Sequence, residues 1–264
     1  MNESVPAGPS LTFAVHDSTT QEVMITVKGP DVLEFESNRQ QRPKDRERPL
    51  RDPVAVVVDA ARLGMFAGPT APPWDSGAEL RTKEVDLVEK RQTWRVAWRN
   101  IDPGVFRVLV NILRSRHLEN IEINTISRDA AIPRSYIDLL KLPYPVPRAS
   151  APFILDYEMP DRTGRNRYLQ ICFAREPDDA ETEAVFDALD KWTWLLMLGG
   201  YPGENMDPSQ SGAAPDPAFL VDSRTVEQAF PDLFLCDDDC YAAVINYAQA
   251  LHRSVCPIEI LLIR

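Results

Sequence analysis

Pairs of strand-like segments, separated by single helical segments, are the pattern that most restricts the fold of this chain. Polar and apolar residues alternate from Thr93 to Trp98 and from Leu118 to Ile126, and an amphipathic helix is predicted between them. Asp102 suits the N-cap of that helix and Pro103 suits its first position. Neighbouring strands favour antiparallel pairing, because parallel strands need a long crossover connection.

A second set of elements follows a proline-marked connection from Ile132 to Pro147. It is predicted to contain a hairpin over 152–158 and 167–174, the longest helix from Pro177-Asp178-Asp179 to Gly199-Gly200, one or two strands over 219–235, a helix after Asp237-Asp238-Asp239, and a buried strand over 258–263. The expected class is α+β, with mostly antiparallel sheets and helices packed on one face. Two ferredoxin-like halves are one such arrangement.

The provisional division is an amino-terminal α+β half, 1–145, and a carboxy-terminal α+β half, 146–264. The exits from two predicted helices look alike, since Leu113-Arg114-Ser115 leads to Ile121-Glu122-Ile123 much as Arg253-Ser254 leads to Ile258-Glu259-Ile260. A match this short fits either a duplication or a shared preference of helix-to-strand loops.

Three further segments complete the predicted elements. A hairpin is predicted over 11–15 and 23–27, a strand covered on both faces over Pro53 to Asp59, and a short helix over 134–140. The β-branched run Val54-Ala55-Val56-Val57-Val58 is the reason for the strand at 53–59.

Composition indicates an ordinary globular protein. The chain has 264 residues, 44% of them hydrophobic and 26% charged, so it can bury a core without disulfides or metal staples. No apolar run approaches the roughly 20 residues that span a bilayer, and the amino terminus has no signal-peptide pattern. The four cysteines are expected to be reduced thiols. A cytoplasmic protein without membrane contact is the expectation.

Negative charge is concentrated in one region of the sequence. Residues 175–240 contain 16 of the 40 acidic side chains and three basic ones, a net charge of −13, so that the rest of the chain sums to +2. If these carboxylates form one continuous surface, the surface would attract a basic protein partner and repel nucleic acid.

The candidate partner-binding residues are two acidic helix starts and one indole. They are Asp178, Asp179, Glu181, Trp194, Asp237, Asp238 and Asp239. The carboxylates also suit helix capping, because acidic groups are favoured at helix amino termini. Trp192 and Trp194 point about 200° apart on one helix, so one of them should meet a second packing surface or be exposed.

Catalytic and metal-binding patterns are weak, and we predict no cofactor. No nucleophile elbow, P-loop or dinucleotide-binding glycine pattern occurs, and the chain has three histidines. Cys236, Cys240, His252 and Cys256 are soft or borderline ligands within 21 residues. The helix between Cys240 and Cys256 would hold them about 24 Å apart, so these four are not expected to share a metal ion.

The polar stretch 37–52 contains six basic residues and is predicted to be a solvated loop. It could meet the acidic region 175–240 of a second copy, which makes a homodimer electrostatically plausible.

The leading hypothesis is a non-catalytic cytosolic interaction protein whose acidic surface docks on a basic protein partner, as an inhibitor, an immunity-type protein or an accessory subunit would. The alternative is an enzyme or small-molecule-binding protein with a carboxylate- and aromatic-lined pocket between the two halves.

Overall fold

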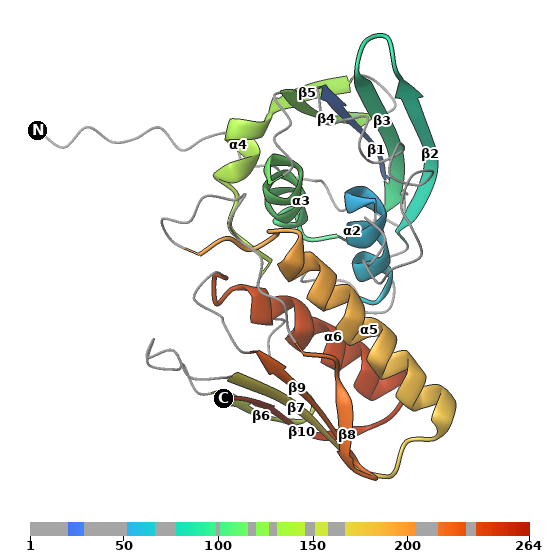
Figure 1. Ribbon diagram of the computed structural model, residues 1–264, viewed down its shortest axis with the longest axis vertical. Coiled ribbons are helices and arrows are strands. Elements are labelled where there is room, and N and C mark those ends of the chain that lie inside the picture. The colour runs from blue at the N-terminus through green and yellow to red at the C-terminus, as the bar shows by residue number, and fades with distance from the viewer. Residues whose placement is uncertain are drawn as a thin grey trace, which may run out of the picture.

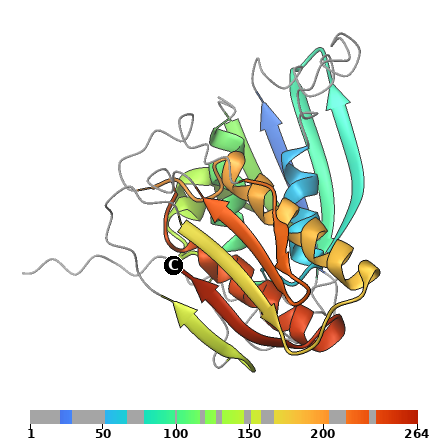
Figure 2. The ribbon, with the colours of Figure 1, turned by 60° about the horizontal axis from the view of Figure 1, so that its bottom comes forward.

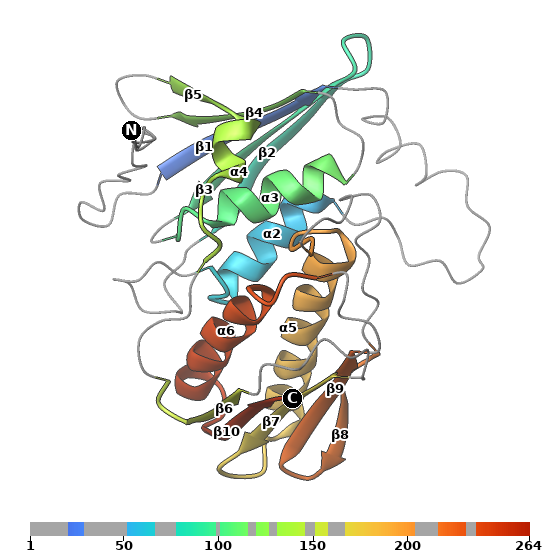
Figure 3. The ribbon, with the colours of Figure 1, turned by 90° about the vertical axis from the view of Figure 1, so that its left-hand side faces the viewer.

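The protein is an α+β sandwich of four layers, in which two sheets enclose two layers of helices (Figures 1 and 3). The computed structural model describes residues 21–28, 52–66, 78–98, 101–115, 120–126, 131–145, 151–157, 167–203, 216–230 and 236–264. Helices α2 and α3 cover one face of the first sheet, and α5 and α6 cover one face of the second. The predicted fold class is therefore confirmed.

Along the chain, single helices are separated by pairs of strands, with one strand at each end. The elements are β1 (Gln21–Lys28), α2 (Pro53–Arg62), β2 (Glu79–Asp86), β3 (Arg91–Trp98), α3 (Val105–Arg114), β4 (Asn120–Ile126), β5 (Ala131–Ser135), α4 (Tyr136–Leu140), β6 (Ile154–Tyr157), β7 (Arg167–Phe173), α5 (Asp179–Met197), β8 (Phe219–Asp222), β9 (Thr225–Phe230), α6 (Cys240–Ser254) and β10 (Ile258–Ile263).

Each sheet has five strands. The first has the order β2-β3-β1-β4-β5, with antiparallel neighbours throughout. The second has the order β6-β10-β7-β9-β8 and is antiparallel except for the pair β10 and β6. The hairpin predicted over 152–174 is wrong, because β10 lies between β6 and β7. The carboxy-terminal strand thus fills a position that local sequence cannot reveal.

The same order of elements occurs twice. The segments β1-α2-β2-β3-α3-β4 and β7-α5-β8-β9-α6-β10 place their strands in the equivalent orders β2-β3-β1-β4 and β8-β9-β7-β10. Each sheet also has a fifth strand. In the first sheet β5 is antiparallel to its neighbour β4, whereas in the second sheet β6 is parallel to its neighbour β10. Two ferredoxin-like halves are therefore not confirmed. The division at residue 145 stays a prediction, since one continuous hydrophobic cluster contains residues from both sheets.

Equivalent turns in the two halves make equivalent hydrogen bonds. The backbone N–H of Asp102 donates to the carbonyl of Phe66, and that of Asp237 donates to the carbonyl of Tyr201, both at 2.9 Å. The two donors are 135 positions apart in the sequence, and so are the two acceptors. The first helix of each half also ends before a glycine of positive φ, 87° at Gly64 and 77° at Gly199. The repeated order therefore extends to details of the backbone.

The segment Pro53 to Asp59 forms the helix α2, so the strand predicted there is wrong. Asp52 is its N-cap, and the Oδ1 atom accepts from the backbone N–H groups of Val54 at 2.9 Å and Ala55 at 3.1 Å. Both α3 and α5 pack against α2, and all four of its valines are buried. Helices buried on several sides can be as apolar as a central strand, so the run of β-branched residues was not decisive.

Helix α3 begins at Val105, later than the sequence predicts. The Oδ1 atom of Asp102 accepts from the backbone N–H of Gly104 at 2.7 Å, which forms a turn ahead of the helix. Gly104 is the N-cap residue, and its close approach to the carbonyl of Pro143 leaves no space for a side chain, since a Cβ atom would lie 2.5 Å from that oxygen. The predicted N-cap aspartate therefore stabilises the preceding turn.

Candidate functional site

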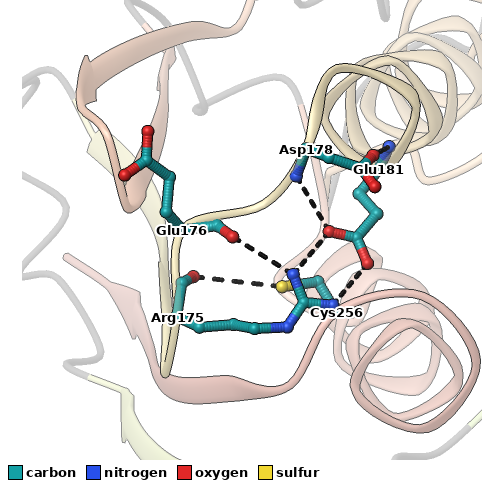
Figure 4. Close-up of polar contacts among 5 residues, drawn as sticks. All are labelled: Arg175, Glu176, Asp178, Glu181 and Cys256. Atoms are coloured by element: carbon teal, nitrogen blue, oxygen red, sulfur yellow. Dashed lines mark hydrogen bonds and ion pairs between the residues drawn. The ribbon is translucent and has the colours of Figure 1, made fainter.

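The first acidic group lies at the start of α5, where it caps the helix. Asp178 is the N-cap residue, and its Oδ1 atom accepts from the backbone N–H of Glu181 at 2.8 Å. Oε2 of Glu181 accepts from the backbone N–H of Asp178 at 2.9 Å, which completes a capping box (Figure 4). Asp179 is the first residue of the helix and is exposed. The capping role predicted for this helix start is therefore present.

Glu181 is also neutralised by Arg175, which follows β7. The two terminal nitrogens of Arg175 donate to the two carboxylate oxygens at 2.5 and 2.7 Å, a bidentate ion pair (Figure 4). This ion pair, together with the hydrogen bond from Asp178, lowers the pKa of Glu181 to about 2. Sγ of Cys256 lies 4.0 Å from the backbone oxygen of Arg175, so the end of α6 lies beside the start of α5.

The second acidic group, Asp237 to Asp239, forms the turn before α6. Asp237 accepts from the backbone N–H of Asp239 at 3.0 Å, and Asp238 forms an ion pair with the buried Arg167 at 3.0 Å. Asp239 is the N-cap residue but makes no side-chain capping bond. Burial, and then the charge of Asp237, raise the pKa of Asp239. Each of the three aspartates therefore has a different environment.

The two acidic groups lie at opposite ends of the helix pair, because α5 and α6 run antiparallel. Trp192 donates from Nε1 to the carbonyl of Cys240 at 3.0 Å near one end, and the hydroxyl of Tyr247 donates to the carbonyl of Ala184 at 3.3 Å nearer the other. The 15 residues of α6 correspond to a separation of about 22 Å. These two groups do not form the single continuous negative surface expected from region 175–240.

The exposed indole expected on α5 is not found. Trp192 is 0% exposed and packs edge-on against Phe230, with ring centroids 4.9 Å apart, and Trp194 is 6% exposed. The helix lies between its own sheet and α2, so it meets packing surfaces on two sides (Figure 1). Of the two alternatives predicted for these tryptophans, the structure contains the second packing surface. Trp194 therefore offers almost no area to a partner.

Exposed carboxylates remain at the end of the molecule that contains the start of α5 and the turn between β8 and β9. In that turn, Nε of Arg224 donates to the carbonyl of Phe173 at 3.0 Å, so the turn lies beside the chain that leads into α5. We define the acidic end as Glu176, Asp178, Asp179, Glu183 and Asp222, all of which are exposed. Among the described residues none of the five is in an ion pair, because Arg175 and Arg224 pair with Glu181 and Glu259.

A second cluster lies where the two halves meet, and the sequence did not reveal it. The guanidinium of Arg107 lies 3.7 Å from the ring centroid of Tyr144, and the rings of Tyr144 and Tyr201 are 5.0 Å apart. Nδ2 of Asn111 donates to the hydroxyl of Tyr144 at 3.0 Å. We define the junction cluster as Asp102, Arg107, Asn111, Tyr144, Tyr201 and Asp239. These residues come from four described segments of the chain, and the acidic helix starts were the only sequence signal for any of them.

Burial dominates the electrostatics of the junction cluster. It raises the pKa of Tyr144 to about 12 and that of Tyr201 well above its ordinary value. It also raises the pKa of Asp102, against the effect of the hydrogen bond from Gly104. The hydroxyl of Tyr201 is buried and has no hydrogen-bond partner among the described residues. The cluster therefore contains phenols that stay neutral. It also contains carboxylates, which a cation or a hydrogen-bond donor would stabilise.

The four cysteines and His252 have structural positions. All four cysteines lie in the described part of the chain, and none is in a disulfide. Cys240 and Cys256 lie at opposite ends of α6, as predicted. Nδ1 of His252 accepts from the backbone N–H of Ile258 at 3.0 Å and so joins α6 to β10. The described residues contain no group of three or more side chains arranged to hold a metal ion.

The basic loop 37–52 lies outside the described residues except for Asp52, as does the strand expected at 11–15. A homodimer formed through this loop stays a prediction. No helix in the described ranges combines the length and apolar character needed to cross a membrane.

Comparison with protein-family models finds no family that matches the chain, and comparisons with curated proteins and with solved structures find no match either. The fold defines the class of protein, an α+β sandwich with a repeated order of elements.

Proposed function

We propose that this is a non-catalytic cytosolic interaction protein that docks on a basic protein partner through its acidic end. The supporting observation is that five exposed carboxylates at one end of the molecule have no ion-pair partner among the described residues. Beside them lies the edge strand β8, whose side chains are exposed and mostly apolar. A surface that combines apolar area with unneutralised charge is better suited to contact with another protein than to contact with solvent.

The acidic end would act mainly on encounter and specificity. Exposed carboxylates of one sign speed the approach of a basic partner, and salt screens this effect over a Debye length of about 8 Å at physiological ionic strength. An inhibitor, an immunity-type protein or an accessory subunit would use such a surface. The thiols, none of which is in a disulfide, are consistent with a reducing compartment.

The test is an affinity purification from native lysate of the source cells at low and at high salt, followed by mass spectrometry. The variant E176Q/D179N/E183Q removes charge from the acidic end, and D237N/D239N removes charge from the opposite end of α6 as a matched control. We expect a basic protein to be enriched by the wild type and by the control at low salt, and to be lost with the triple variant and at high salt. Equal enrichment by the triple variant would refute the proposal.

A second candidate function is supported by the junction cluster, namely binding of a small molecule that donates hydrogen bonds. The specific observation is the buried hydroxyl of Tyr201, which has no hydrogen-bond partner in the described structure. After burial, the charges of nearby groups, Asp102 and Asp239 among them, raise the pKa of this hydroxyl further. Native mass spectrometry of the purified protein tests this function. A bound mass that is present in the wild type and absent in Tyr201→Phe would support it, and identical ligand-free spectra would count against it.

A further inference from the structure

The edge strand β8 exposes three consecutive apolar side chains. Phe219, Leu220 and Val221 are 46%, 45% and 51% exposed. The strand stands at the end of the order β6-β10-β7-β9-β8, so its only partner among the described strands is β9 (Figure 2). An edge strand presents unpaired N–H and C=O groups, which another extended chain can use for pairing. This strand therefore has both the backbone and the side chains of a strand-pairing site.

The repeated order of elements supplies an internal comparison for β8. Its equivalent in the first half is β2, which is also the second strand of its set and also lies at the edge of its sheet. The eight residues of β2 include Glu79, Arg81, Lys83, Glu84 and Asp86, whereas β8 has one charged residue, Asp222. Charged side chains are a common protection of natural sheet edges against pairing. The same position in the fold is thus protected in one half and unprotected in the other.

The charge around β8 indicates which occupant fits. Asp216 precedes the strand and Asp222 is its last residue; both are exposed and form no ion pair with any described residue. The nearby Arg224 is already paired with Glu259 at 2.9 Å. A second copy paired along the same edge would add its own Asp216 and Asp222 without a new cation, so like charges would oppose that dimer. A basic segment would bring the missing positive charge.

We propose that β8 pairs with an extended segment of the basic partner, which joins the second sheet as a sixth strand. This inference rests on the proposed function and adds the mode of recognition. Main-chain hydrogen bonds along β8 would supply affinity, and alternate side chains of the segment would contact either the apolar residues of the strand or the carboxylates of Asp216 and Asp222. Four residues of β8 extend over roughly 13 Å, so the segment needs about four to six residues.

Three synthetic peptides test this mode directly. The first is a capped hexapeptide of alternating lysine and valine, the second has glutamate in place of lysine, and the third is the lysine peptide with N-methyl groups on all its internal amides, so that neither of its edges can donate the main-chain hydrogen bonds of a strand. We expect the first peptide to protect the backbone amides of 219–222 in hydrogen exchange. We expect the glutamate and the N-methylated peptides to bind at least about tenfold more weakly.

A protein variant separates strand pairing from charge alone. Val221→Asp adds negative charge but removes apolar contact from the edge, so pairing predicts weaker binding of the lysine peptide and charge alone predicts equal or tighter binding. Leu87→Asp is the matched control, since Leu87 is an exposed apolar residue in the turn between β2 and β3, far from β8. It should leave binding unchanged.

Three results would overturn the inference. Binding of the lysine peptide that survives N-methylation or Val221→Asp would assign recognition to charge alone, and the proposed function would stand without strand pairing. Absence of any protection at 219–222 would remove β8 as the site. A dimer in analytical ultracentrifugation that Val221→Asp dissociates would identify a second copy as the occupant. The proposed function itself fails only if the acidic-end variant E176Q/D179N/E183Q retains the basic partner.

Discussion

Asn111 and Asn246, which are 135 positions apart, make reciprocal hydrogen bonds across the junction of the two halves. Nδ2 of Asn111 on α3 donates to the carbonyl of Gly200 at 3.1 Å, and Nδ2 of Asn246 on α6 donates to the carbonyl of Met65 at 3.3 Å. The two acceptors are also 135 positions apart, and both asparagines are buried. Each half thus uses the same residue of its second helix to satisfy the turn after the first helix of the other half.

Replacing either asparagine by alanine should destabilise the whole protein. Each change leaves a buried carbonyl without its donor, which costs about 1–3 kcal/mol in the free energy of unfolding. Asn111→Ala also removes the hydrogen bond from Nδ2 of Asn111 to the hydroxyl of Tyr144. Urea denaturation measures both values, with the exposed Asn120→Ala as the control. Two separate unfolding transitions in the variants would show instead that the halves are not coupled through these bonds.

Asp52 explains why the valine-rich segment 53–62 is helical, and its loss should be costly. Besides capping α2, its Oδ2 atom accepts from Nε1 of Trp94 at 3.0 Å and pairs with Lys83 at 3.1 Å. Asp52→Ala removes the cap and leaves the buried indole N–H without its acceptor, so we expect a loss of about 2–4 kcal/mol in unfolding free energy.

Lys83→Met is the matched comparison for Asp52→Ala. The Lys83 side chain is partly exposed, so this variant should lose less than about 1 kcal/mol in unfolding free energy. Both values come from urea denaturation. Equal losses for the two variants would mean that the ion pair, rather than the cap and the indole bond, supplies the stabilisation.

Much of the fold could be predicted from local pattern, and the failures have a common physical cause. The helix from Asp179 and the buried strand ending at Ile263 were predicted, because caps and apolar periodicity lie within each segment. The strand expected at 53–59 failed because α2 is covered on several sides by other elements. The hairpin expected at 152–174 failed because β10 pairs between its two strands. Burial and sheet order are set by residues far away in sequence.

The candidate site was predictable only in part, for the same reason. The acidic helix starts at Asp178 and Asp237 are visible as capping residues, but their separation depends on the antiparallel packing of α5 and α6. Tyr144 and Tyr201 gave no signal, because 56 intervening residues and a different half of the fold separate them. The run Phe219-Leu220-Val221 was visible as a strand, but its position at a sheet edge was not.

Gly200 should not tolerate a side chain, although its equivalent in the first half is Met65. A Cβ atom at Gly200 would lie 2.9 Å from the carbonyl of Leu195 and 2.9 Å from Cγ1 of Val108. Gly200→Ala should therefore cost about 1–3 kcal/mol in unfolding free energy, as overpacking does. The double variant G200A/V108A should be less destabilised than the sum of the two single variants, because one of the two close contacts is removed. Simple additivity in urea denaturation would contradict this packing.

The ion pair between Glu181 and Arg175 should make part of the stability depend on pH at the acid end of the range. The pKa of Glu181 in the folded protein is about 2, below its ordinary value of 4.5. A lowered pKa means that the stabilisation is fully present above about pH 4.5 and is lost as the pH falls through about 2. Glu181→Gln should therefore lower the urea midpoint at pH 7 and at pH 5, and the difference from wild type should shrink progressively between pH 4.5 and pH 2. Salt should reduce the same difference, because the pair lies at the surface.

Asp179→Asn is the control, since it removes a neighbouring carboxylate that forms no ion pair among the described residues. A difference between wild type and Glu181→Gln that stays constant down to pH 2 would show that the capping bonds, and not the charge of Glu181, stabilise this helix start.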